Sequence, residues 1–113
     1  MNKVQEKWVN EGYCDTRGAG FCANATRLPD GSYGIVALCV KGNTLGIYDV
    51  DMKNNMKELL FKVQLNRIEQ LKIRSNIFSQ KLYFVYNGGE YSFTNFIGVK
   101  PALKVIEEES NNK

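Results

Sequence analysis

The order of segments in the second half of this chain constrains its fold more than any other feature. Four short runs rich in β-branched and aromatic residues precede one amphipathic helix near 98–109; the runs occupy residues 58–65, 68–73, 82–86 and 90–94. Because no helical pattern separates the runs, a doubly wound α/β fold is excluded. The segment predicts antiparallel strands that are joined by tight turns and closed by a helix.

One hairpin is predicted at Asn87-Gly88-Gly89, because Asn-Gly and Gly-Gly pairs are typical of two-residue hairpin turns. With either pair at the corner, the alternation of side chains along a strand places five apolar residues on one face. These residues are Leu82, Phe84, Tyr86, Tyr91 and Phe93.

A second hairpin is predicted around residues 28–32, whose sequence Leu-Pro-Asp-Gly-Ser is typical of a turn. It joins strands expected at 21–27 and 33–40. A turn centred between Asp30 and Gly31 predicts two cross-strand pairs: Cys22 with Cys39, and Ala25 with Val36.

The remaining strands are less regular. A strand is expected at 44–50, and the polar residues 51–57 are expected to form a surface loop. The apolar positions of 68–73 break strict alternation, which predicts a bulge near Glu69-Gln70. Such bulges are common where a sheet curls into a barrel.

A short helix is predicted at the N-terminus, within residues 1–12. Asn2 suits its N-cap, and Gln5 stands at the spacing of a capping box. Val4 and Trp8 lie one helical turn apart, so they form a narrow apolar stripe. A helix this short is stable only when it docks on another surface.

The C-terminal helix, expected at 98–109, has an apolar stripe at the i, i+3, i+4 and i+7 positions: Val99, Ala102, Leu103 and Ile106. Pro101 suits its first turn. The carboxylates of residues 107–109 oppose the helix dipole, so we expect the helix to fray from there.

Together these patterns predict a single α+β domain over residues 1–113, with the N-terminal helix within 1–12, seven antiparallel strands over 20–96 and the C-terminal helix at 98–109. The sheet is expected to form a barrel or sandwich, with the C-terminal helix plugging one end. Eleven side chains are expected in the core: Leu45, Ile47, Phe61, Val63, Leu65, Ile73, Leu82, Phe84, Phe93, Leu103 and Ile106.

Three segments carry a resemblance to a known family: Thr44-Leu45-Gly46-Ile47-Tyr48, residues 60–68, and residues 91–96 running into the final helix. In pattern and order, residues 20–110 resemble small bacterial pleckstrin-homology-like (PH-like) domains. The resemblance implies a lipid-binding, peptide-binding or architectural module. Lipid-binding members carry several basic residues around the first hairpin, whereas this chain has only Arg27 there, beside Asp30.

Composition argues against several classes of function. The chain has no histidine, so it lacks the commonest general base and metal ligand, and no catalytic residue, metal or cofactor is predicted. The net charge of +3 is small and scattered, so nucleic acid is not an expected partner. With no apolar stretch of signal-peptide or membrane-spanning length, a cytoplasmic protein is expected.

The three cysteines, Cys14, Cys22 and Cys39, form no Cys-x-x-Cys pair. If the predicted register holds, Cys22 and Cys39 form either a reversible redox pair or two buried, inert thiols. We favour inert thiols, because no neighbouring cation in the sequence activates either one.

Two groups of residues are candidate binding sites. Trp8 and Val4 either fill an open end of the barrel or dock on a neighbouring protein. The second group surrounds the tip at residues 75–80, where two apolar side chains meet three cations: Lys72, Arg74, Ile77, Phe78 and Lys81. This tip either enters a membrane surface or has Phe78 folded back on the core with the cations guarding a strand edge, and we favour the second interpretation.

The leading hypothesis for function is a non-enzymatic binding or scaffolding module that holds an unidentified protein partner, or a second copy of the chain, through a strand edge or the Trp8 helix. The alternative is peripheral association with anionic lipid through the 75–80 tip. An enzyme is the third class, because no residue spacing here suggests a catalytic site.

Overall fold

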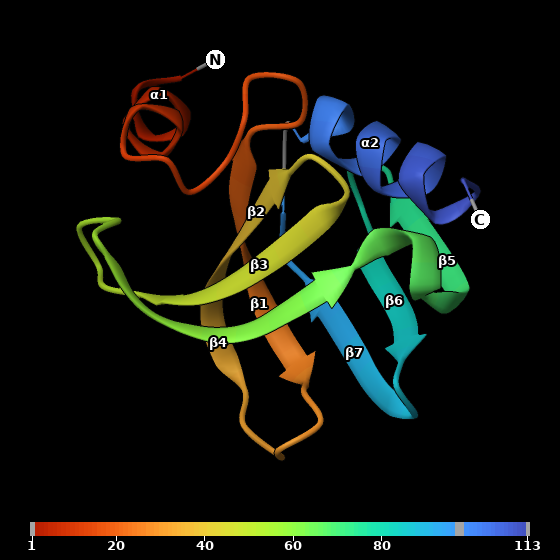
Figure 1. Ribbon diagram of the computed structural model, residues 1–113. Helices are drawn as coiled ribbons and strands as arrows, with labels where there is room; N and C mark the ends of the chain where they lie inside the picture. The colour runs from red at the N-terminus through yellow and green to blue at the C-terminus, as the bar shows by residue number, and fades with distance from the viewer. Residues whose placement is uncertain (1, 97–98, 113) are drawn as a thin grey trace.

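The computed structural model describes residues 2–96 and 99–112. Within that part of the chain the fold is α+β, with a seven-stranded antiparallel sheet, a short N-terminal helix and a C-terminal helix (Figure 1). The elements are α1 (Lys3–Asn10), β1 (Gly20–Arg27), β2 (Gly34–Lys41), β3 (Thr44–Val50), β4 (Met56–Gln64), a 3-10 turn η1 (Leu65–Arg67), β5 (Glu69–Ser75), β6 (Gln80–Tyr86), β7 (Gly89–Thr94) and α2 (Lys100–Ser110).

The predicted α+β class is therefore confirmed. The expected start of the last helix at residue 98 lies outside the described residues, as do Met1 of the predicted N-terminal helix and the end of the chain at residue 113. No helix in the described ranges is long and apolar enough to cross a membrane.

The strands are ordered β4-β3-β2-β1-β7-β6-β5 across one sheet, so β4 and β5 are its two edges. The sheet is strongly curled, and η1 connects the two edge strands along the chain (Figure 1). Curling brings the apolar faces of distant strands around one core, but β4 and β5 are not hydrogen-bonded neighbours. Each edge therefore retains one side of its backbone outside the ladder.

The register of the first hairpin differs from the prediction. Gly20 pairs with Cys39, and Ala25 with Gly34, so both expected pairs are wrong by two residues. The reason is the position of the corner: the amide of Gly31 donates to the carbonyl of Leu28, which centres the turn on Pro29-Asp30. Proline at the second turn position and glycine at the fourth are favourable in this geometry. A shift of two residues leaves each side chain on its predicted face.

The hairpin between β6 and β7 forms as predicted. Asn87 and Gly88 both adopt positive φ angles, 51° and 77°, as a primed two-residue turn requires. Phe84 pairs with Tyr91, and their rings stack with centroids 4.8 Å apart. The expected bulge is also confirmed, because the pairing of β5 with β6 shifts between Glu69 and Lys72.

The surface loop before β4 is shorter than expected and ends before Met56, the first residue of that strand. The Asp51 carboxylate organises this loop by accepting hydrogen bonds from the amides of Lys53 and Asn55, at 2.8 Å and 2.9 Å. These hydrogen bonds, led by those from Asn55, hold the pKa of Asp51 below its usual value.

The main core lies inside the curled sheet and is closed at one end by α2 (Figure 1). Nine of the eleven predicted core side chains are buried there; Phe61 and Ile73 are instead half-buried and pack against its margin. The whole predicted stripe of α2 is buried: Val99, Ala102, Leu103 and Ile106. The helix packs against η1, β5 and β2, so it covers the end at which the two edges of the sheet approach one another.

The predicted fraying of α2 is wrong, since the helix continues to Ser110. Arg17, in the connection before β1, forms ion pairs with Glu108 at 3.4 Å and Glu109 at 2.9 Å. A cation at this end of a helix offsets the unfavourable interaction of the carboxylates with the helix dipole. This compensation comes from a residue some ninety positions away in the sequence.

Candidate functional site

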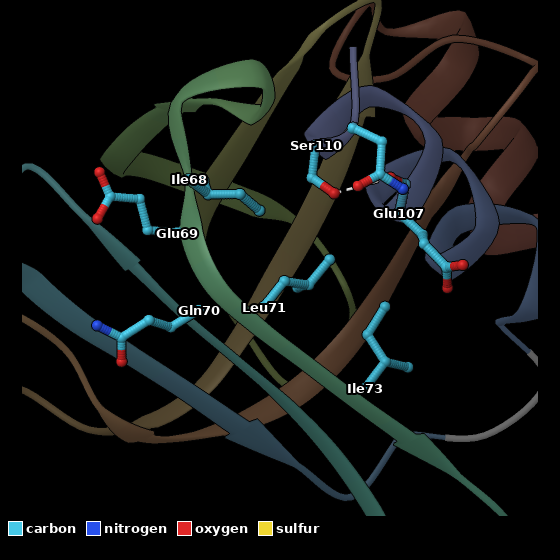
Figure 2. A pocket seen from close by; sticks show the side chains of 8 residues that line it. Ile68, Glu69, Gln70, Leu71, Ile73, Glu107 and Ser110 are labelled. Carbon is cyan, nitrogen blue, oxygen red and sulfur yellow. Dashed lines mark hydrogen bonds between the residues drawn. The ribbon is translucent and has the colours of Figure 1, made fainter. Parts of the chain in front are cut away.

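A groove runs between the edge strand β5 and the last turns of α2 (Figure 2). Its volume is about 530 Å³. Strand β5 supplies one wall and α2 the other, with these lining residues: Ile68, Glu69, Gln70, Leu71, Ile73, Glu107, Ser110 and Asn111. The groove therefore lies where the sheet has a free edge.

Strand β5 contributes apolar side chains to the groove. Figure 2 shows Leu71 and Ile73 pointing from β5 toward α2, whereas Glu69 and Gln70 point away from the helix. Gln70 has a φ of 55° and lies in the bulge of β5. The bulge separates the side chains that point toward α2 from those that point away from it. Ser110 donates a hydrogen bond of 2.7 Å to the Glu107 carbonyl, so its hydroxyl is satisfied within the helix.

The groove is acidic at its rim. Glu69 and Glu107 are among the lining residues, and none of the lining residues is basic. Arg17 engages the other two glutamates of the last helical turns, Glu108 and Glu109. Glu107 forms no ion pair within residues 2–96 and 99–112. A ligand with a positive charge is therefore complementary to this rim.

The opposite face of β5 is basic. Lys72 and Arg74 alternate with Leu71 and Ile73, and Arg74 lies directly opposite Lys81 on β6. The ammonium groups of Lys72 and Lys81 lie 5.5 Å and 5.7 Å from the ring centroid of Tyr83. One strand thus separates a groove with an acidic rim from a basic outer face.

The tip of the β5–β6 hairpin projects its two apolar side chains into solvent. Ile77 is 85% exposed and Phe78 is 92% exposed. Our favoured interpretation, in which Phe78 folds back on the core, is therefore wrong. The core near this end is already occupied by Phe96, whose ring packs 5.5 Å from that of Phe21.

Trp8 is fully buried, at 0% exposure, on the outer face of the sheet and not at an open end of the barrel. Its indole N–H donates to the Asn54 carbonyl at 3.0 Å, and the predicted capping box of Asn2 and Gln5 is present. Val4 packs half-buried beside it. The structure thus uses the Trp8 stripe within the chain, and Trp8 offers no surface to a partner.

The cysteines are not arranged as predicted. Cys39 lies beside Cys14, while Cys22 stands opposite Ala37 and its thiol donates to the Asn54 side chain at 3.5 Å. All three are free thiols in one cluster beneath α1. The hydrogen bond with Cys14 and burial raise the pKa of Cys39, and burial raises the pKa of Cys22. These raised pKa values disfavour the reactive thiolate at Cys39 and Cys22, whereas the hydrogen bond with Cys39 lowers the pKa of Cys14.

In the described ranges, no group of three or more histidine, cysteine or acidic side chains is placed to hold a metal ion. Asp30 instead accepts hydrogen bonds from Ser32, which lower the pKa of its carboxyl. The Asp30 carboxylate therefore organises a turn.

No pattern in the sequence predicted the groove between β5 and α2. Its two walls were both predicted, as a bulged strand and an apolar helical stripe, but not as neighbours. The bulge at Glu69-Gln70 is the available signal, because bulges often lie beside binding sites. The order of strands across the sheet was needed to show that β5 is an edge.

A scan against models of known protein families finds no match for this sequence, and a search of curated proteins finds no relative.

Proposed function

We propose that this protein is a non-enzymatic, PH-like binding module that holds an extended peptide segment of a protein partner in the groove between β5 and α2. The observation that carries the proposal is a free strand edge beside a groove of about 530 Å³ into which Leu71 and Ile73 point. An incoming strand completes the backbone hydrogen bonds of such an edge, and a neighbouring groove receives its alternate side chains.

The groove indicates the chemistry of the peptide. Side chains pointing inward meet Leu71 and Ile73, so apolar residues are favoured there. A basic side chain at the rim meets Glu107. Side chains pointing the other way face Lys72 and Arg74, so neutral or acidic residues are favoured at those alternate positions.

The same charges argue against pairing of two copies through β5. Two β5 edges brought together would oppose their lysine and arginine side chains, and like charges facing one another across a ladder are destabilising. A peptide from a different protein avoids this repulsion. We place the module in the cytoplasm, an assignment supported by three cysteines that are all free thiols.

Selection from a random peptide library on the immobilised protein tests the proposal. We expect the selected peptides to combine an apolar residue with lysine or arginine. One of these peptides is then titrated into isotopically labelled protein. The changes in amide NMR chemical shift should concentrate in β5 and the last turn of α2.

Two tryptophan substitutions provide a matched pair. Asn111→Trp fills the groove that Asn111 lines, and Asn112→Trp places the same side chain on the next exposed residue. Asn111→Trp should weaken binding about tenfold or more, a change of about 1.4 kcal/mol, and Asn112→Trp should leave it unchanged. The proposal would be contradicted if both variants bound the peptide equally, or if the changes in amide NMR chemical shift were confined to the β4 edge.

A further inference from the structure

The tip of the β5–β6 hairpin is an ordered loop that exposes two large apolar side chains. The side-chain oxygen of Asn76 accepts hydrogen bonds from the amides of Phe78 and Ser79, at 3.0 Å and 2.8 Å. Arg74 donates to the Ser79 hydroxyl at 3.2 Å. These bonds order the backbone that carries Ile77 and Phe78, so little backbone freedom remains to be lost when the tip binds.

The surface behind the tip is positively charged. Lys72, Arg74 and Lys81 share the outer face of the hairpin, and no acidic residue occurs between positions 70 and 89. None of the three forms an ion pair within the described part of the chain. Arg74 and Lys81 stand directly opposite each other, an arrangement that is destabilising unless another charge compensates it.

A hollow of about 440 Å³ lies under the tip and adds a fourth cation beside it. Its lining combines Ile77 with Phe96, Pro101 and Lys100. The apolar apex is therefore continuous with the start of α2, where Lys100 lies. A complementary partner must present negative charge at its surface and an apolar layer just below.

We propose that this hairpin tip inserts into the surface of an anionic lipid bilayer. Ile77 and Phe78 enter the boundary between headgroups and acyl chains, while Lys72, Arg74, Lys81 and Lys100 contact the negative headgroups. This surface is separate from the peptide groove, and the inference does not depend on the proposed function.

The area of the tip favours a bilayer over a protein partner. A stable protein interface buries about 800 Å² on each side. A phenylalanine buries about 150–250 Å², so two side chains at a narrow apex supply well under that area. A bilayer needs no matching surface, because it accommodates a small apolar apex wherever the charges are complementary.

Flotation with lipid vesicles tests the inference. The intact chain should bind vesicles of phosphatidylcholine mixed with phosphatidylserine, should not bind phosphatidylcholine alone, and should release as salt is raised. Soluble glycerophosphoserine, which carries the headgroup without acyl chains, should not bind. Phe78→Asp should lower binding to the mixed vesicles about tenfold or more.

The matched control is Tyr33→Asp, which places the same charge at another highly exposed aromatic residue, in the β1–β2 connection. It should bind vesicles as the wild type does. Equal binding by wild type and Phe78→Asp would overturn the inference, as would equal binding to phosphatidylcholine alone. Polyglutamate provides a further test. The inference would also be overturned if polyglutamate bound the wild type and Phe78→Asp equally tightly and displaced the wild type from vesicles.

Discussion

The thiol of Cys39 shows how a single buried residue in this protein departs from its solution chemistry. It lies beneath α1 with 1% of its surface exposed, beside Cys14 and the indole of Trp8. The hydrogen bond with Cys14 and burial raise its pKa above the ordinary value of 9.0. In the unfolded chain the same thiol ionises near that ordinary value. Folding therefore retains a proton that the unfolded chain releases in alkaline solution.

This difference predicts that stability falls as pH rises above about 9. Between the unfolded and folded pKa values the folded state binds more protons, so the free energy of unfolding decreases by up to about 1.4 kcal/mol per pH unit for one thiol. Denaturant unfolding across this range measures the slope. Cys39→Ala should flatten the slope relative to the wild type, although it also lowers stability at neutral pH. An unchanged slope would contradict the assignment.

At the scale of elements, the end of α2 depends on a residue outside the helix. Three consecutive glutamates occupy its last turns, where the helix dipole disfavours negative charge. Arg17 binds two of them from the connection before β1. The same residue therefore ties that connection to the helix that closes the core.

Arg17→Glu should cause the last turn of α2 to fray. The substitution removes both ion pairs and adds a negative charge beside two others. We expect faster hydrogen exchange at the Asn111 amide, which donates to the carbonyls of Glu107 and Glu108. Arg27→Glu is the matched control, because it makes the same charge change at the ion pair with Glu90, elsewhere on the surface. If both variants leave exchange in α2 unchanged, the Arg17 contacts do not hold the helix end.

At the scale of the whole molecule, one curled sheet separates two apolar clusters. The larger lies inside the curl and is closed by α2, and the smaller lies on the outer face beneath α1. Helix α1 thus covers part of the outer face of the sheet, and α2 closes one end of its interior (Figure 1). Strand β2 contributes to both clusters, with Leu38 inside and Ala37 outside, so it is apolar on both faces.

Leu103→Ala should therefore unfold the protein at a markedly lower temperature. Truncating a buried leucine leaves a cavity and costs about 2–5 kcal/mol, which lowers the melting temperature by roughly 10–20 °C in a domain of this size. Phe78→Ala is the comparison, because Phe78 is exposed and should change stability by less than about 0.5 kcal/mol. Thermal denaturation followed by circular dichroism measures both. Equal melting temperatures would show that α2 does not close the core.

Local sequence patterns predicted the helices and strands and which side chains of each are buried. These features depend on residues only a few positions apart. The capping box at Asn2, the Asn87-Gly88 turn and the stripe of α2 are of this kind. The register of the first hairpin was mispredicted, because Pro29-Asp30 and Asp30-Gly31 both suit a corner and differ by one position.

Other features depend on contacts between distant segments and have no local signal. The exposure of Phe78 follows from a core already filled by residues such as Phe96 and Phe21. The burial of Trp8 requires the loop at Asn54 to lie over it. The groove requires β5 to be an edge of the sheet, which only the strand order establishes.

Trp8 is the only tryptophan of the chain, and it is sealed between α1 and the outer face of the sheet, with its indole N–H bound to the backbone of Asn54. When excitation is selective for tryptophan, the fluorescence of the native protein consequently comes from this one buried side chain. A red shift in that emission will signal release of the first helix from the strands. A spectrum that is unchanged after a ligand is added therefore shows that this helix has stayed docked.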